Sequence, residues 1–222
     1  MTDAVVFDLD GVIVDSEHVW DEVREELARE RGGRWHPGAQ RDMMGMSSTE
    51  WSRYMHDTIG LPEPPEEISA EVVRRLAARY REELPLVPGA AEAVRRLAAT
   101  FPLGLASSSN REIIDLVLDL AGLAECFRAT VSSEEVAHGK PAPDVYLEAA
   151  ARLGVDPGAC VAVEDSHNGI RSAKAAGMAV VAAPNLRYPP GEDALAEADA
   201  VIESVAVLQP ETILAAAERA KG

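Results

Sequence analysis

The stretch AVVFDLDGV, residues 4–12, places two carboxylates, Asp8 and Asp10, directly after a short run of apolar residues. Such a run is typical of a strand in an open parallel sheet, and these sheets carry their ligand sites at the carboxyl ends of the strands. A polar strand end followed by a turn explains the same pattern. An EF-hand loop is excluded, because Val12 and Val19 would occupy positions that need oxygen ligands.

Beyond this stretch, short apolar runs alternate with longer segments of helical period, which is typical of a parallel α/β sheet. The expected strands are residues 4–7, 103–106, 129–131, 160–163, 179–182 and 200–202. The expected helices are residues 90–99, 113–121, 145–153 and 170–176. Gly122, Gly154 and Gly177 follow three of these helices, where a left-handed cap is expected. The pattern predicts an α/β fold with a Rossmann-like parallel sheet.

Residues 16–84 interrupt this alternation, because their apolar residues repeat at helical spacing. Trp20, Val23 and Leu27 share one such face, and Ser47-Ser48-Thr49-Glu50 fits a capping box that opens a later helix. We therefore expect a helical cap at residues 16–84, inserted after the first strand and lying over its carboxyl end. The expected α/β core comprises residues 1–15 and 85–222.

The composition excludes several classes of partner. The 222 residues include 38 Asp and Glu against 21 Lys and Arg, a formal charge of −17, which disfavours nucleic acids and anionic membranes. No apolar run resembles a signal peptide or approaches the ~20 residues of a membrane span. Cys126 and Cys160 form no C-x-x-C motif. We expect a cytoplasmic protein that binds neither nucleic acid nor membrane. The sequence indicates no oligomeric state.

Three further motifs follow later strands. The segment LGLASSSN, residues 103–110, runs into small polar residues before a helix, which suits phosphate binding or ordinary N-capping. Lys140 lies between a glycine and two prolines in GKPAPD, residues 139–144; this is not a Walker A motif, and a lone lysine is usually solvated. In CVAVEDSHNG, residues 160–169, the acids Glu164 and Asp165 follow an apolar strand, either as exposed loop residues or as ligands for a hard cation.

Taken together, these motifs place four carboxylates, one lysine, a serine cluster and helix N-termini at the carboxyl ends of strands. Phosphoryl transfer needs this inventory, because its catalysis consists mainly of positioning and of neutralising oxygen charge with a metal and a cation. A carboxylate can also act as the nucleophile and form an aspartyl-phosphate. The residues therefore favour phosphoryl transfer with Mg²⁺.

In this order, the four motifs resemble those of the haloacid dehalogenase superfamily, in the phosphatase branch with β-phosphoglucomutase-like and phosphoglycolate phosphatase-like enzymes. The resemblance implies that Asp8 attacks phosphorus, while Asp10 serves as general acid and then as general base. It further implies a phosphate site and a Mg²⁺ site. Lys140 is implied to be a catalytic residue that pairs with Asp8 and with the phosphate oxygens. The other implied phosphate ligands are Ser107, Ser108 and the backbone N–H groups of Leu9 and Asp10. The implied Mg²⁺ ligands are Asp8, the backbone carbonyl of Asp10 and Asp165, supported by Glu164.

The expected function is thus that of a Mg²⁺-dependent phosphatase of a small phosphorylated metabolite, such as a sugar phosphate. A phosphomutase is the nearest alternative. The histidine that mutases carry in the cap hinge aligns with Trp20, although His18 lies two residues earlier. Their cap arginine follows a Gly-x-Ser, whereas Gly45-Met46-Ser47 precedes Ser48, with Arg41 or Arg53 as possible substitutes. Both losses favour hydrolysis.

Two other functions are less well supported by the sequence. A dehalogenase of this superfamily needs no metal and lacks the second aspartate, but Asp10, Glu164 and Asp165 are all present here. A non-catalytic signalling module that stores a phosphoryl group on aspartate has a similar sheet. Such modules are about half this length and carry no cap, so the expectation remains a hydrolase.

Overall fold

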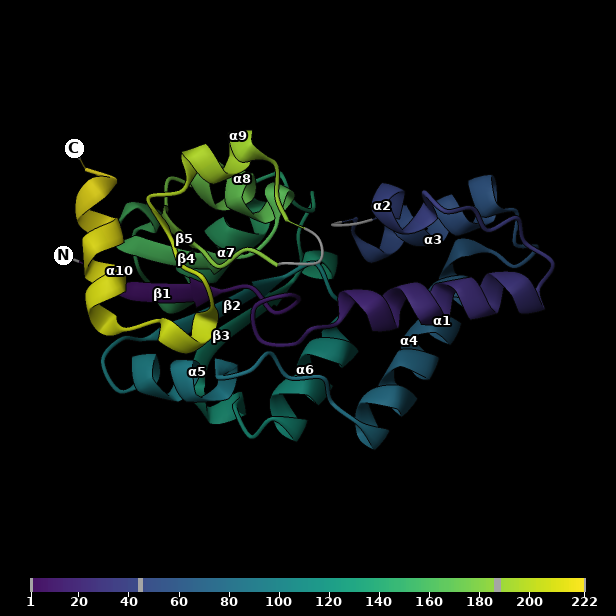
Figure 1. The fold of residues 1–222 in the computed structure, drawn as a ribbon, viewed down its shortest axis with the longest axis horizontal. Helices are drawn as coiled ribbons and strands as arrows, with labels where there is room; N and C mark the ends of the chain where they lie inside the picture. Colours follow the sequence, from purple (N-terminus) through teal and green to yellow (C-terminus); the bar gives the residue numbers. More distant parts are fainter. Residues whose placement is uncertain (1, 44–45, 186–188, 222) are drawn as a thin grey trace.

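The computed structural model describes residues 2–43, 46–185 and 189–221 and contains a six-stranded sheet in the order β3-β2-β1-β4-β5-β6 (Figure 1). Every neighbouring pair is parallel, which confirms the predicted sheet. Val6 in the central strand pairs with Gly104 on one side and Ala162 on the other. The strands are β1 Ala4–Phe7, β2 Leu103–Ser107, β3 Phe127–Ser132, β4 Cys160–Glu164, β5 Ala179–Ala182 and β6 Ala200–Val201.

Helices cover both faces of the sheet, and the alternating side chains of β1 separate two apolar clusters. Val5 and Phe7 pack in the cluster that includes residues of α5, α6 and α10, while Ala4 and Val6 pack in the one with residues of α7 and α8. Burial of both faces explains why β1 and β5 are apolar throughout. The helices of this part are α5 Ala90–Ala98, α6 Arg111–Leu120, α7 Asp144–Leu153, α8 His167–Ala175, α9 Glu192–Glu197 and α10 Pro210–Arg219.

Residues between β1 and α5 form a helical insertion, as the sequence predicts. The described part of residues 16–84 contains no strand. Its helices are α1 Glu17–Glu30, α2 Ala39–Met43, α3 Ser48–Tyr54, the π-helical turn Met55–Ile59 and α4 Pro65–Glu82. The predicted capping box opens α3, where the Ser47 N–H donates to Glu50 Oε2 at 2.8 Å. Figure 1 shows the insertion beyond the end of the sheet at which β1 terminates.

Two helices begin earlier than predicted, because their first turns are polar and lack the apolar spacing from which a helix is predicted. Helix α6 begins at Arg111 and α8 at His167, two and three residues before the expected starts at 113 and 170. Ser166 caps α8 by accepting a hydrogen bond from the Gly169 N–H. The glycine caps are confirmed, since Gly122, Gly154 and Gly177 all have positive φ. Within the described ranges, no helix combines the length and apolarity that crossing a membrane requires.

Candidate active site

The two central strands bring three acidic side chains together. In the parallel pairing of β1 with β4, Phe7 lies beside Val163, so Asp8 and Glu164 follow at the same edge. The Asp8 N–H donates to the Val163 carbonyl at 3.0 Å. Carboxylate oxygens of Asp8, Glu164 and Asp165 lie within 4.8 Å of one another, and all three residues are buried. The predicted convergence of two acidic strand ends is therefore observed.

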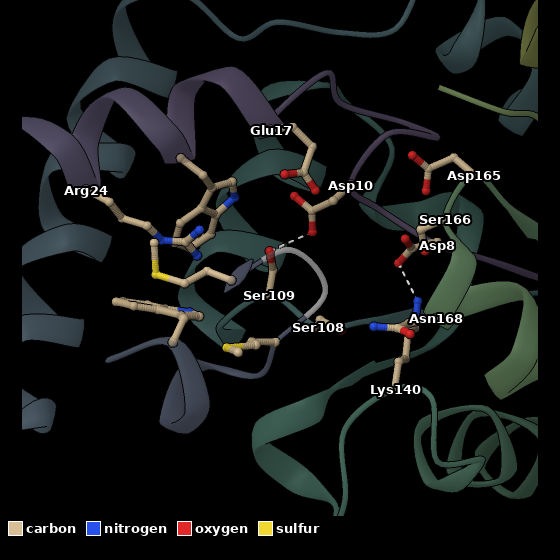
Figure 2. Close-up of a pocket in the computed structure, with 14 residues that line it drawn as sticks. Asp8, Asp10, Glu17, Arg24, Ser108, Ser109, Lys140, Asp165, Ser166 and Asn168 are labelled. Atoms are coloured by element: carbon tan, nitrogen blue, oxygen red, sulfur yellow. Dashed lines mark hydrogen bonds and ion pairs between the residues drawn. The ribbon is translucent and has the colours of Figure 1, made fainter. Parts of the chain in front are cut away.

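Lys140 reaches this cluster from the loop before α7. Its Nζ lies 2.9 Å from Asp8 Oδ1 and 2.6 Å from Glu164 Oε1, and the residue is buried (Figure 2). Burial alone would lower the pKa of Lys140, but Asp8 and Glu164 outweigh it and raise that pKa above its usual range. Lys140 is therefore charged at neutral pH and is not the solvated lysine of the alternative interpretation.

One lysine does not balance three buried carboxylates. Burial raises the pKa of both Asp8 and Asp165 above the usual range, and repulsion from Glu164 raises both further. A divalent cation would relieve this repulsion, and carboxylate oxygens are the ligands that hard cations prefer. The cluster therefore fits a divalent metal ion.

Glu164 is fully enclosed and anchors the cluster. Its Oε1 accepts from Lys140 Nζ and, at 2.8 Å, from the Tyr146 hydroxyl on α7. Its Oε2 accepts from the backbone N–H groups of Asp165 and Ser166 at 3.0 and 3.2 Å. A Cβ on Gly169 would lie 1.8 Å from Glu164 Oε1, so only glycine leaves room for this carboxylate. Tyr146 was not predicted from the sequence, because a hydroxyl on the apolar face of a helix was its only signal.

Asp10 turns away from the acidic cluster toward serine hydroxyls. Its Oδ1 accepts from Ser16 Oγ at 2.5 Å, and its Oδ2 accepts from Ser109 Oγ at 2.7 Å and Ser107 Oγ at 3.3 Å. Gly11, which follows Asp10, has a φ of +77°, and a Cβ there would lie 1.8 Å from Asp165 Oδ2. This glycine therefore leaves room for the Asp165 carboxylate beside the turn that follows Asp10.

The expected phosphate ligands divide into two groups. Ser108 lines the cavity beside Asp8, whereas Ser107 is fully buried and accepts from the Ser109 N–H at 2.9 Å. Ser109, which the sequence analysis did not select, also lines the cavity. Leu9 has a buried side chain, and within the described ranges its N–H and that of Asp10 donate no hydrogen bond. Of these groups, Ser108 and Asp10 line the cavity, whereas Leu9 does not.

The helical insertion supplies the opposite wall of this cavity, which has a volume of about 60 Å³. Glu17, Trp20, Arg24 and Trp51 line it from the insertion, and Figure 2 shows Asp10 and Glu17 between Arg24 and the cluster around Asp8. Burial, followed by repulsion from Asp10, raises the pKa of Glu17 to about 7. Burial lowers the pKa of Arg24 to about 10, which leaves it charged at neutral pH.

The residues that bear on mutase chemistry lie at different distances from the cavity, and only some of them line it. Trp20 lines the cavity, whereas His18 lines a separate groove with Arg79. Arg41 and Arg53 are exposed and do not line the cavity. Gly45 lies outside the described residues. The arginine that does enter from the insertion is Arg24, which the sequence analysis missed although it follows Trp20 by four residues on the buried face of α1.

Comparisons with known proteins agree with this architecture. The model of the haloacid dehalogenase-like hydrolase family matches residues 2–177. Hexitol phosphatase B of Escherichia coli (strain K12) is 36% identical over 208 residues, which cover 84% of this chain and 86% of that protein. The bifunctional riboflavin kinase/FMN phosphatase of Arabidopsis thaliana is 32% identical over 207 residues, covering 92% of this chain but only 54% of that longer protein.

A solved structure extends the similarity to the whole fold. The crystal structure of CbbY from Rhodobacter sphaeroides in complex with phosphate matches with a TM-score of 0.85 at 27% identity. The match covers 96% of this chain and 99% of that one, so it includes the insertion as well as the sheet.

Proposed function

The chain belongs to the haloacid dehalogenase-like hydrolases, and on that premise we propose that it is a Mg²⁺-dependent phosphatase of a small phosphorylated metabolite. The observation that carries the proposal is the buried cluster of Asp8, Glu164 and Asp165 with Lys140, beside the unpaired N–H groups of Leu9 and Asp10. Such a site binds a cation and a phosphoryl group together. The names of the relatives, hexitol phosphatase among them, support a small phosphate ester as substrate.

In the proposed reaction, Asp8 is the nucleophile. An Asp8 carboxylate oxygen forms a bond to phosphorus while the bond from phosphorus to the leaving oxygen breaks, and Asp10, which enters this step as the protonated acid, gives that oxygen its proton. Asp10 then takes a proton from a water molecule that attacks phosphorus, which releases phosphate and restores Asp8. Hydrogen bonds from Ser16 and Ser109 hold the Asp10 carboxylate in place for both transfers.

The remaining residues bind and neutralise the transferred group. Lys140, Ser108 and the N–H groups of Leu9 and Asp10 are the proposed phosphate ligands, with Ser107 positioning Asp10 from behind. The proposed Mg²⁺ ligands are Asp8, the Asp10 carbonyl and Asp165. When bound, the ion supplies positive charge to the phosphoryl oxygens. Glu164 supports the site by fixing Lys140 rather than by facing the cavity.

We assign residues 16–84 as a cap that controls access to the site. The cavity of about 60 Å³ is much smaller than the ~300–1,000 Å³ of typical ligand pockets, so a substrate larger than phosphate requires the insertion to move. A cytoplasmic location is also part of the proposal, supported by the two unpaired cysteines, Cys126 and Cys160.

Phosphate release from a panel of sugar and sugar-alcohol phosphates tests the proposal. We expect turnover with Mg²⁺, loss of turnover with EDTA and loss of at least about a thousandfold in Asp8→Asn, because the nucleophile is removed. Asp57→Asn, a change of an exposed acid in the insertion, is the matched control and should retain activity. Turnover that survives Asp8→Asn would refute the nucleophile assignment, and isomerisation without phosphate release would indicate a mutase.

A further inference from the structure

The cavity wall that the insertion contributes contains a buried cation, the guanidinium of Arg24. Arg24 is 6% exposed and lies on α1, across the cavity from Asp8 and Lys140 (Figure 2). Its Nε is buried and has no hydrogen-bond partner among the described residues. A buried guanidinium with an unused donor is costly, which is a reason to expect a ligand at this position.

Two indole rings fix the orientation of this guanidinium. The Arg24 Cζ lies 4.7 Å from the ring centroid of Trp20 and 4.6 Å from that of Trp51. The two rings also contact each other, with centroids 5.9 Å apart. Cation–π contacts of this kind favour arginine because its planar group stacks on aromatic faces and still presents its N–H donors at the edge. The donors of Arg24 are therefore held in place before any ligand binds.

A hydrogen-bond acceptor lies on the same face of α1. Glu17 precedes Arg24 by seven residues, close to two helical turns, and both side chains line the cavity. The Gln40 amide donates to Glu17 Oε2 at 3.0 Å and fixes the carboxylate. This wall therefore presents donors and an acceptor together.

The charges around Arg24 decide which ligand this wall accepts. Glu17 and Asp10 line the same cavity as Arg24, so a ligand that reaches the guanidinium also lies beside these two carboxyl groups. A second phosphate or a carboxylate on the substrate would be attracted by Arg24 but repelled by these acids. Hydroxyl groups both accept and donate hydrogen bonds, so they match an arginine beside a carboxylate.

We propose that Arg24 and Glu17 determine specificity by binding hydroxyl groups of an uncharged leaving group, so that sugar or sugar-alcohol monophosphates are preferred over bisphosphates and phosphorylated acids. This inference rests on the proposed phosphatase function and names its substrate class. Trp20 and Trp51 act as positioning residues, because they contact the guanidinium that binds the substrate.

A matched series of six-carbon esters tests the inference by kcat/KM. Sorbitol 6-phosphate carries the hydroxyls, hexyl phosphate lacks them, and 6-phosphogluconate and sorbitol 1,6-bisphosphate add a distal negative charge. We expect sorbitol 6-phosphate to exceed each of the others by about 10- to 100-fold, the range of hydrogen bonds to charged groups. A preference for the bisphosphate or the phosphorylated acid, or equal rates for sorbitol 6-phosphate and hexyl phosphate, overturns the inference.

Substitutions of Arg24 test whether this residue causes the preference for a hydroxylated leaving group. In Arg24→Met the ratio of sorbitol 6-phosphate to hexyl phosphate should fall toward one, whereas Arg53→Met, an exposed arginine in a different groove, should keep the wild-type ratio. Arg24→Lys retains the charge but not the planar group, and an intermediate ratio is expected even if Arg24→Met does not fold. An unchanged ratio in a folded Arg24 variant overturns the inference.

Different results would refute the proposed function and the inference about Arg24 and Glu17. With p-nitrophenyl phosphate as a general substrate, absence of turnover for every ester with Mg²⁺ present refutes the phosphatase assignment and the inference with it. Turnover of p-nitrophenyl phosphate without the hydroxyl preference refutes the inference alone.

Discussion

Removing the hydroxyl of Tyr146 is the sharpest structural perturbation of this site. Tyr146→Phe deletes one atom that donates to Glu164 Oε1 at 2.8 Å inside the protein. The ring remains, and with it the contact of Lys140 Nζ, which lies 5.0 Å from the ring centroid. Burial, followed by the charge of Glu164, raises the pKa of Tyr146 well above its usual value, so its hydroxyl is protonated at neutral pH. The substitution therefore tests one hydrogen bond to a buried carboxylate.

The expected loss of stability depends on the hydrogen bonds that Glu164 retains in Tyr146→Phe. A hydrogen bond to a charged group contributes about 1.5–3 kcal/mol. Because Lys140 still donates to the same oxygen, the lower part of that range applies, about 1.5–2 kcal/mol. For a chain of this size, each kcal/mol lowers the unfolding temperature by about 2–4 °C, so we expect a decrease of about 3–8 °C.

Thermal unfolding followed by circular dichroism measures this effect, with Tyr54→Phe as the control. Tyr54 is half-buried, and its hydroxyl donates to Asp42 Oδ2 at 2.9 Å in a solvent-exposed bond and contacts His36 Nε2 at 3.0 Å. Because water can replace the exposed bond, this deletion should cost less than about 1 kcal/mol. An unfolding temperature for Tyr146→Phe equal to that of wild type, or to that of Tyr54→Phe, would refute the assignment of Glu164 as a buried anchor.

Three other outcomes are expected from the same structure. Gly169→Ala places a Cβ 1.8 Å from Glu164 Oε1 and should lower the free energy of unfolding by about 3 kcal/mol in urea denaturation; a loss below about 1 kcal/mol contradicts the packing. Millimolar Mg²⁺ at a hundred times its Kd should raise the unfolding temperature by about 5–10 °C, and this rise should disappear in Asp165→Asn. A hydrogen bond from Arg74 lowers the pKa of Glu71 from 4.5 to about 2, so the stability that Glu71 contributes is present above pH 4.5 and is lost as the pH falls through about 2. Glu71→Gln should accordingly be less stable than wild type by about 0.5 kcal/mol at pH 7, and this difference should shrink as the pH falls below about 4.5. A difference that stays constant across pH would exclude an ionic origin.

The sheet could be predicted because its strands carry a local signal. Burial on both faces makes β1 and residues 160–163 of β4 continuously apolar, and the acids Asp8 and Glu164 mark where these apolar runs end. Asp8 and Glu164 could therefore be expected at one edge of the sheet. The order of the strands, and so the contact between these two ends, depends on long-range pairing that no local pattern encodes.

The residues that the sequence analysis missed act through long-range contacts. Tyr146 follows an apolar period on α7 and differs from its neighbours only by the hydroxyl that reaches Glu164. Arg24 lies on the face of α1 that Trp20 and Leu27 define, so a charged residue on a buried face was the available signal. Its position beside Trp51 depends on the packing of α3 against α1, which the spacing within one helix cannot show.

The central claim is that Asp8 carries the phosphoryl group during turnover, and trapping that intermediate tests it most directly. The protein is mixed with Mg²⁺ and a substrate that it hydrolyses, quenched in acid within milliseconds, digested and analysed by mass spectrometry. We predict one phosphoryl group on the peptide that contains Asp8, located on that residue, and none on the same peptide of Asp8→Asn. Turnover with a phosphoryl group on another residue, or a labelled peptide in Asp8→Asn, would contradict the proposed mechanism.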